Sequence, residues 1–224
     1  MNVNKDVLMS CRLFNGVEEV TVTENILPRG TVRTYTRGEN LFLTQDHVGE
    51  IMILLSGKVK SVYYLEEGEQ DVRSIFLPPR LIGVDLICTR TRIAPYQAMA
   101  VESSTVFTFP AEVILAPGSV SEAERLKCLN NLLLILSQVN MQNQYRLAIL
   151  THNGLRERIT VYLTMQANKA HSDTFRIPFS REEMASFLSV NRSALSHELG
   201  LMKHEGLIDF RKNVFTLLTR GEKE

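Results

Sequence analysis

The sequence predicts an α+β protein with an N-terminal β-roll, one long helix, and a C-terminal winged helix-turn-helix. Three observations lead to this fold class. Short runs of β-branched and aromatic residues recur between turn residues over 18–115. The stretch 121–150 contains neither Pro nor Gly and repeats its apolar residues at helical spacing. Two helix-start signals lie close together within 179–208. We therefore expect domains at 1–120, 121–152 and 153–224.

The N-terminal part reads as the strands of a jelly roll or sandwich. Turn signals such as Arg37-Gly38 and Ser56-Gly57 separate the apolar runs at regular spacing, which favours this class over alternating strands and helices. A hairpin is expected around EEGEQ (66–70). The expected strand runs are TVRTY (31–35), ENLFLT (39–44), EIMILLSGKVKSVYYL (50–65), VRSIFL (72–77) and VESSTVFTFP (101–110).

The long helix is expected to span about 30 residues, or roughly 45 Å. A helix of this length beside a small domain rarely buries itself alone, so a two-helix dimer seam is a natural use of it. Packing wholly on its own β domain is the alternative. His152-Asn153-Gly154 is a candidate hinge, and 155–169 reads as the next helix. The positions that repeat at helical spacing are Leu126, Leu129, Leu133, Leu136, Asn140 and Leu147.

A capping box starts the first of two short helices in the window 179–208. Ser180 and Glu183 have the required spacing, in which each side chain bonds to the backbone of the other. We expect this helix over 181–188, with a tight turn directly after it. The residues expected on its buried face are Met184, Ala185 and Leu188.

The second short helix is expected to begin after Asn191, a favoured N-cap residue, and to end at Gly206. A small hairpin, or wing, is expected over 211–218. Helix, turn, helix and wing define a winged helix-turn-helix, whose second helix enters the major groove of DNA with its N-terminal end. The residues expected to face the core of that helix are Leu195, Leu199 and Met202.

The outward side of the second helix carries polar groups that suit DNA reading. Arg can bind guanine O6 and N7 in a bidentate way, and Ser or His can donate to bases or phosphates. A capping box and helical periodicity also occur in many helical cores, so it is their combination with this polar side that favours double-stranded DNA. The seven candidate DNA-binding residues are Arg181, Asn191, Arg192, Ser193, Ser196, His197 and Lys203.

The composition excludes several classes of protein. The longest apolar runs, such as 132–136, are far too short to cross a membrane, and the N-terminus has no signal-peptide pattern, so we expect a cytoplasmic protein. Cys11, Cys88 and Cys128 are widely spaced without a CxxC pair, which argues against a disulfide scaffold or a zinc site. Lys and Arg number 25 against 25 Asp and Glu, a balance that gives no global sign of nucleic acid.

The window 179–208 resembles the C-terminal domain of the cyclic-AMP receptor protein/FNR (Crp/Fnr) family of bacterial transcription regulators. The resemblance covers nearly the whole chain. Residues 37–70 are similar to the family's β-roll, 77–87 to the segment before its effector pocket, and 155–163 to the start of its DNA-binding domain. The long helix takes the place of the dimerisation helix. The matching residues in the window are Glu183, Met184, Ala185, Leu188, Val190, Arg192, Ser193, Leu195, Ser196, Leu199, Met202, Glu205, Gly206 and Ile208.

The resemblance implies a homodimer that binds a near-palindromic site through one recognition helix per subunit, with RNA polymerase as a further partner. Arg192, Ser193 and His197 occupy the three main base-reading positions. The family often has Glu at the second and commonly Arg at the third, so the preferred DNA sequence is expected to differ here. Ser189 replaces the usual turn Gly and is expected at a mildly strained positive φ. Gly200 inside the helix should cost about 1 kcal/mol relative to Ala.

The cyclic-nucleotide signature of the family is missing. That signature is Gly-Glu-Leu followed by Arg-Ser/Thr-Ala, in which the Glu takes the ribose hydroxyl and the Arg pairs with the phosphate. Val84 stands in place of the Glu, and 95–98 (PYQA) in place of the second part, so a buried phosphate would lack its bidentate partner. We expect a small effector other than cyclic AMP, or a pocket filled by side chains in a regulator controlled by its abundance. The candidate effector-binding residues are Ile82, Gly83, Val84, Asp85, Leu86, Tyr96 and Gln97.

No metal or other cofactor is expected. An iron–sulfur sensor of this family needs a cysteine cluster near the N-terminus, and only Cys11 is there. A haem ligand could be only His47 or His152, neither of which has a supporting pattern. A metal-dependent cupin enzyme shares the jelly-roll plan but needs several His or carboxylate ligands in the β half, where His47 is the single histidine. A third alternative is an interaction protein whose helix-turn-helix no longer binds DNA, since 179–212 carries five Lys and Arg against five Asp and Glu.

Overall fold

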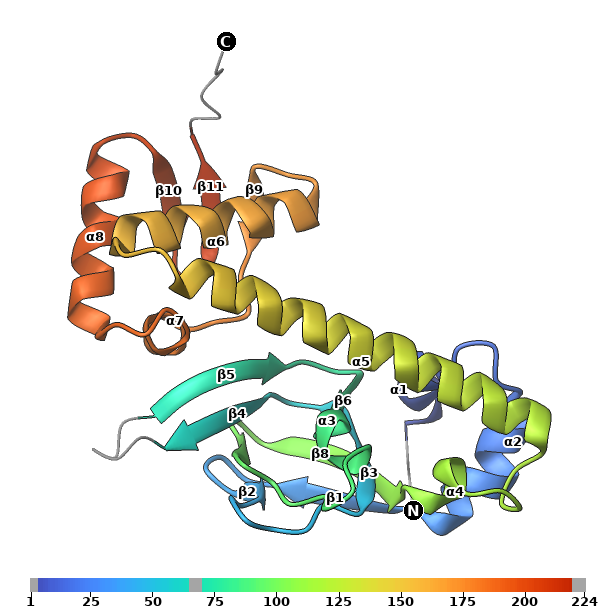
Figure 1. Ribbon diagram of the computed structural model, residues 1–224. Helices are drawn as coiled ribbons and strands as arrows, with labels where there is room; N and C mark the ends of the chain where they lie inside the picture. The colour runs from blue at the N-terminus through green and yellow to red at the C-terminus, as the bar shows by residue number, and fades with distance from the viewer. Residues whose placement is uncertain (1–3, 65–69, 219–224) are drawn as a thin grey trace. The chain divides into compact units, whose positions relative to one another are not determined.

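The computed structural model (Figure 1) describes residues 4–64 and 70–218. The chain divides into two compact units, each with its own core. The first consists of Met1–Glu69 with Arg73–Met141, and the second of Gln70–Val72 with Gln142–Glu224. The observed class is α+β, as the sequence predicts.

Two four-stranded sheets build the first unit, and together they form the predicted β-roll. One sheet has the order β1-β8-β3-β6 and the other β2-β7-β4-β5. Neighbours in the first sheet are antiparallel, as are β2 with β7 and β7 with β4. The strands are β1 (Thr31–Tyr35), β2 (Asn40–Phe42), β3 (Glu50–Ser56), β4 (Val59–Tyr64), β5 (Gln70–Phe76), β6 (Arg80–Ile82), β7 (Gln97–Ala100) and β8 (Ser104–Pro110).

The prediction of strands over 18–115 is wrong at its start and incomplete later. Residues 19–29 are helical, because Val22 and Ile26, four residues apart, are fully buried and the Thr23 hydroxyl donates to the Glu19 carbonyl at 3.1 Å. These contacts override the β propensity of the Val and Thr residues. The sequence does not predict β6, β7 or two short helices, and residues 66–69 of the expected hairpin turn lie outside the described residues. The helical segments in question are α2 (Glu19–Thr21), η2 (Val22–Ile26), η3 (Leu27–Arg29), α3 (Val84–Ile87) and α4 (Glu112–Leu115).

Helix α5 (Glu122–Leu150) confirms the predicted long helix. Polar bonds tie it to the N-terminal segment, which contains α1 (Lys5–Met9) and η1 (Arg12–Phe14). The Asn131 amide donates to the carbonyl oxygens of Leu13 and Asn15 at 2.9 and 2.8 Å. Because Asn131 is almost fully buried, its amide would be costly to leave without these partners.

One side of α5 is left uncovered by the described part of the chain. Leu133 and Leu134 are 63% and 61% exposed, which is unusual for two adjacent leucines in a helix. The alternative of a helix packed wholly on its own β domain is therefore wrong. Neither α5 nor another described helix is long and apolar enough to span a membrane. The other large apolar side chains of α5 that are about half exposed are Leu126, Met141, Tyr145 and Leu147.

The second unit is a winged helix-turn-helix with a three-stranded antiparallel sheet of order β10-β11-β9. In Figure 1, α6 runs across these strands, and α7 and α8 follow as the two short helices. The wing hairpin is β10 and β11, so it begins three residues before the predicted 211–218. The elements are α6 (Leu155–Ala170), β9 (Thr174–Arg176), α7 (Arg181–Phe187), α8 (Arg192–His204), β10 (Ile208–Arg211) and β11 (Val214–Leu217).

Local signals in this unit are confirmed by the backbone. The capping box is formed: Glu183 N donates to Ser180 Oγ at 3.3 Å, and Ser180 N donates to Glu183 Oε2 at 2.6 Å. Ser189 has φ of 55°, the left-handed conformation expected where the family has Gly. The predicted core residues are all buried, namely Met184, Ala185, Leu188, Leu195, Leu199 and Met202.

Candidate DNA-binding surface and effector region

The first half of α8 has one buried side and one open side. Leu195 and Leu199 are fully buried, so the polar residues on the other side of the helix are turned outward. An α-helix fits the major groove of B-DNA, where base edges present distinct donor and acceptor patterns. The exposed polar side chains on this half of α8 are Arg192, Ser193, Ser196 and His197.

Asn191 and Ser193 form the start of α8. Asn191 Oδ1 accepts the Ala194 N–H at 2.7 Å and the Ser193 hydroxyl at 2.8 Å. The cap fixes where the helix begins and therefore where Arg192 stands. The Ser193 oxygen keeps its lone pairs, so it can accept a hydrogen bond from a base amino group.

Arg181, at the start of α7, packs against the wing. Its guanidinium lies 4.9 Å from the ring centroid of Phe210 and 5.3 Å from that of Phe215, and Nη2 donates to the Lys212 carbonyl at 3.2 Å. Burial lowers the pKa of Arg181 from its ordinary value. Because a guanidinium has five N–H donors, this packing leaves donors for a DNA phosphate.

Lys203, near the end of α8, is also bound to the wing. Its Nζ lies 2.5 Å from Asp209 Oδ1 and 5.3 Å from the Phe210 ring centroid. The hydrogen bond from Lys203 lowers the pKa of Asp209. Phe210 therefore contacts a cation from α7 and a cation from α8, which links both helices to the wing.

An aromatic cluster of Phe42, Tyr63 and Tyr96 occupies the region where an effector was expected. The Tyr96 ring centroid lies 5.7 Å from that of Phe42 and 5.4 Å from that of Tyr63. The buried Tyr96 hydroxyl donates to Asp85 Oδ1 at 2.7 Å. Burial, followed by the neighbouring Asp85 carboxylate, raises the pKa of Tyr96, so the hydroxyl stays protonated and donates.

The candidate effector residues lie at the end of β6, on and directly before α3, and at and directly before the start of β7. Gly83 has φ of 67° and precedes α3, which carries Val84, Asp85 and Leu86. Val84 is buried among apolar neighbours and offers no polar group at the position of the family's Glu. Asp85 is the only exposed member, and the buried members are Ile82, Gly83, Val84, Leu86, Tyr96 and Gln97.

The three cysteines do not form a metal site among the described residues. Burial raises the pKa of the Cys11 and Cys128 thiols to about 11, which suits packed, unreactive thiols. Cys88 is exposed, and all three are free. No group of three or more His, Cys, Asp or Glu in the described ranges, 4–64 and 70–218, is placed to hold a metal ion.

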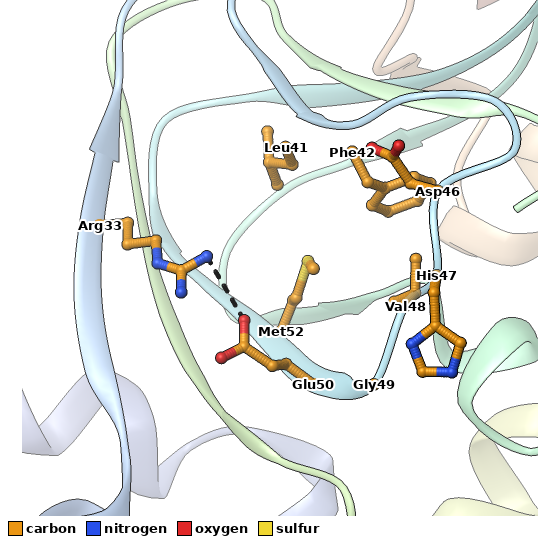
Figure 2. Close-up of a pocket in the computed structure, with 9 residues that line it drawn as sticks. All are labelled: Arg33, Leu41, Phe42, Asp46, His47, Val48, Gly49, Glu50 and Met52. Carbon is orange, nitrogen blue, oxygen red and sulfur yellow. Dashed lines mark ion pairs between the residues drawn. The ribbon is translucent and has the colours of Figure 1, made fainter. Parts of the chain in front are cut away.

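A cavity of about 350 Å³ opens on the β-roll beside β1, β2 and β3. Figure 2 shows the Arg33–Glu50 ion pair on one side and Asp46 and His47 on the other. Phe42 lines this cavity and also contacts Tyr96, so it links the cavity to the aromatic cluster. The lining residues are Arg33, Leu41, Phe42, Asp46, His47, Val48, Gly49, Glu50 and Met52.

The sequence alone does not predict Phe42, Tyr63 or the cavity as parts of the effector region. They come from strands that are distant in the chain, and no local motif marks them. A different group was also missed, the ion pairs of Arg156 with Glu198 and Glu205. No local spacing marks this group, because Arg156 lies more than 40 residues before the two Glu residues and on another helix.

The fold and the outward polar side of α8 are those of a DNA-binding transcription regulator with an N-terminal β-roll. Two family models match the chain: a cyclic nucleotide-binding domain over residues 32–116 and a Crp-like helix-turn-helix domain over residues 157–221. The chain belongs to the Crp/Fnr family of transcription regulators. This confirms the resemblance drawn from the sequence.

Curated relatives belong to the same family. The transcriptional activator protein Anr of Pseudomonas aeruginosa is 26% identical over 197 residues, covering 86% of this chain and 78% of the relative. The anaerobic regulatory protein of Haemophilus influenzae is 26% identical over 211 residues, covering 89% and 77%.

Solved structures share the fold. FixK2 from Bradyrhizobium japonicum superposes with a TM-score of 0.67 at 15% identity, covering 85% of this chain and 93% of that one. The regulator CLP of Xanthomonas campestris, described as responsive to c-di-GMP, has a TM-score of 0.71 at 15% identity and covers 90% and 100%. At these identities the likeness concerns the fold alone.

Proposed function

We propose that the protein is a homodimeric, sequence-specific DNA-binding regulator that acts in the cytoplasm, contacts RNA polymerase, and is not an enzyme. The observation that carries this proposal is α8, whose apolar side is buried while its polar side is open. Arg192 contacts a guanine, and Ser193 and His197 read neighbouring bases. The residues that contact phosphates or hold the helix start are Arg181, Asn191, Ser196 and Lys203.

The uncovered side of α5 supports the homodimer. Leu126, Leu133, Asn140 and Leu147 are spaced seven residues apart, the repeat of a two-helix seam. An Asn in such a seam pairs with its counterpart and sets the register. Two copies joined along α5 would carry two α8 helices, which suits a near-palindromic site with half-sites about one helical turn apart.

The β-roll is proposed to respond to a small organic molecule other than cyclic AMP, without haem or an iron–sulfur cluster. Val84 and the stretch 95–98 stand where the family has the residues that hold the ribose and the phosphate, and Tyr96 is already bonded to Asp85. The cavity beside Phe42 has the volume of a small-ligand site. A molecule there would contact Phe42 and through it the aromatic cluster.

A second candidate is a regulator whose β-roll is structural and whose activity depends on its abundance. The contacts of Tyr96 with Phe42, Tyr63 and Asp85 favour it, because they fill the effector region with the protein's own side chains.

The domain limits expected from the sequence, 1–120, 121–152 and 153–224, remain part of the proposal.

Selection from a pool of random-sequence duplexes tests the proposal. The purified protein is incubated with the pool, and the retained DNA is sequenced. We expect an enriched palindrome with half-sites about one helical turn apart. Enrichment without additive supports the second candidate, and enrichment only with metabolites from a cell extract supports the small-molecule effector. Absence of enrichment in both conditions would show a chain that no longer reads DNA.

A further inference from the structure

Arg156 of α6 binds two carboxylates of the α8 segment at once. Its Nε donates to Glu198 Oε1 at 2.5 Å, and its Nη1 and Nη2 donate to the two oxygens of the Glu205 carboxylate at 2.6 and 2.8 Å. We call these three residues the α6–α8 clamp. Only Arg has N–H donors on three nitrogen atoms in one rigid plane, so a Lys could not make the same bonds.

The clamp holds α8 at two points. Glu198 lies in the middle of the helix and Glu205 is its C-cap, seven residues or nearly two turns further on, so both project from the same flank. Lys203, on the other flank of the apolar stripe, is bound to Asp209 of β10. Apolar contacts are non-directional, whereas hydrogen bonds on both flanks restrain rotation of the helix about its axis.

The clamp is unsuited to bind DNA phosphates itself. One guanidinium faces two carboxylates, which gives a net charge of −1 for the group when all three are ionised. The hydrogen bonds that Arg156 donates to Glu205 and Glu198 raise the pKa of Arg156, and the bond from Arg156 lowers the pKa of Glu205, so Arg156 and Glu205 stay charged at neutral pH. Three of the five N–H donors of Arg156 are bonded to carboxylates, and the net negative charge of the group repels phosphate.

We propose that Arg156 is a positioning residue for DNA reading, which sets the orientation of α8 on α6 and thereby directs Arg192 and Ser193 toward the base edges. This inference rests on the proposed function. Base contacts require alignment, whereas non-specific binding depends on phosphate charge alone. Loss of the clamp should therefore weaken binding to the selected duplex and leave binding to other DNA unchanged.

The test compares Arg156→Ala, Arg156→Lys, Glu205→Gln and the double variant Arg156→Ala/Glu205→Gln on the selected and a scrambled duplex. We expect each single change to lower the ratio of specific to non-specific affinity about tenfold, the scale of one lost base contact. The double variant should lose no more than Arg156→Ala, because both remove one shared interaction. Lys169→Ala, which removes an exposed cation from the same helix, is the matched control and should leave the ratio unchanged.

Two other results would overturn the inference. If Arg156 contacted phosphate, Arg156→Ala would weaken binding to both duplexes equally. It would also reduce the slope of log affinity against log salt concentration by about one, and Glu205→Gln would strengthen binding. If the clamp were structural only, the variants would melt at lower temperature while the affinity ratio of the folded protein stayed at the wild-type value.

A measurement without DNA keeps the inference separate from the proposed function. Spin labels attached to the variants Thr164→Cys in α6 and Leu201→Cys in α8, in a Cys88→Ser background, report the distance between the helices. We expect a narrow distribution in the parent and a broader one in Arg156→Ala. Equal distributions would contradict the clamp, whereas a wild-type chain that enriches no duplex would contradict only the proposed function.

Discussion

Helices α5 and α8 both carry apolar stripes, but α8 buries its stripe within the described chain, whereas α5 buries only part of its apolar side chains. Leu195 and Leu199 of α8 are fully buried, whereas Leu133 and Leu134 of α5 are more than half exposed. The polar side of α8 is open in turn. The buried side of α8 needs no further partner, so its polar side is available to recognise DNA. The exposed apolar surface of α5 is the surface that a second copy of the chain would cover in the proposed dimer.

The largest expected effect comes from charging the open side of α5. Leu133→Glu with Leu134→Glu should produce a monomer, because two carboxylates per subunit would be buried in the seam. DNA affinity should fall by at least about 100-fold, since each half-site is then bound alone. Sedimentation and binding to the selected duplex check this. Leu133→Met with Leu134→Met is the control, and a Glu variant that remains dimeric would remove α5 as the seam.

The same truncation in the two helices should act in different ways. Leu195→Ala in α8 leaves a cavity and should cost about 2–5 kcal/mol of unfolding free energy. This loss should not depend on protein concentration. Leu133→Ala in α5 should weaken mainly the dimer, so its effect should grow as the protein is diluted. Urea unfolding at several concentrations distinguishes the two, and equal behaviour would contradict the comparison.

A change on the open side of α8 should affect recognition and leave the fold intact. Arg192→Ala should weaken binding to the selected duplex by about 1–3 kcal/mol and relax specificity at one base pair. Binding to duplexes with each base substituted in turn measures this. An unchanged affinity and an unchanged preference would show that α8 does not read the bases.

The smallest effect is expected at Gly200, on the open side of α8. Gly200→Ala should stabilise the protein by up to about 1 kcal/mol, because Ala has the higher helix propensity. A Cβ built at this position meets no atom within 4 Å, so no clash offsets the gain. Thermal unfolding measures it. A lower melting temperature would mean that α8 is not a regular helix at this position.

The winged helix-turn-helix could be predicted almost completely because its signals are local. The capping box of Ser180 and Glu183, the N-cap Asn191 and the spacing of Leu195 and Leu199 each act within a few residues, and each is present in the structure. Local hydrogen bonds and helical periodicity do not depend on distant parts of the chain. The positions of the candidate DNA-binding residues on these helices could therefore be predicted from the sequence.

The β-roll was predicted less well because tertiary contacts decide its details. The helical turns at 19–29 depend on burial of Val22 and Ile26, which outweighs local β propensity. The contacts of Tyr96 with Phe42 and Tyr63 join residues that are distant in the chain, and no spacing in the sequence predicts them.

The sequence by itself determined the fold class, the family and the polar side of the recognition helix, since these depend on periodicity, caps and residue type. Only the tertiary structure decided that Tyr96 bonds to Asp85 and that Arg156 joins α6 to α8. Both depend on side chains that lie far apart in the chain or on different elements, and their geometry exists only after the core has packed.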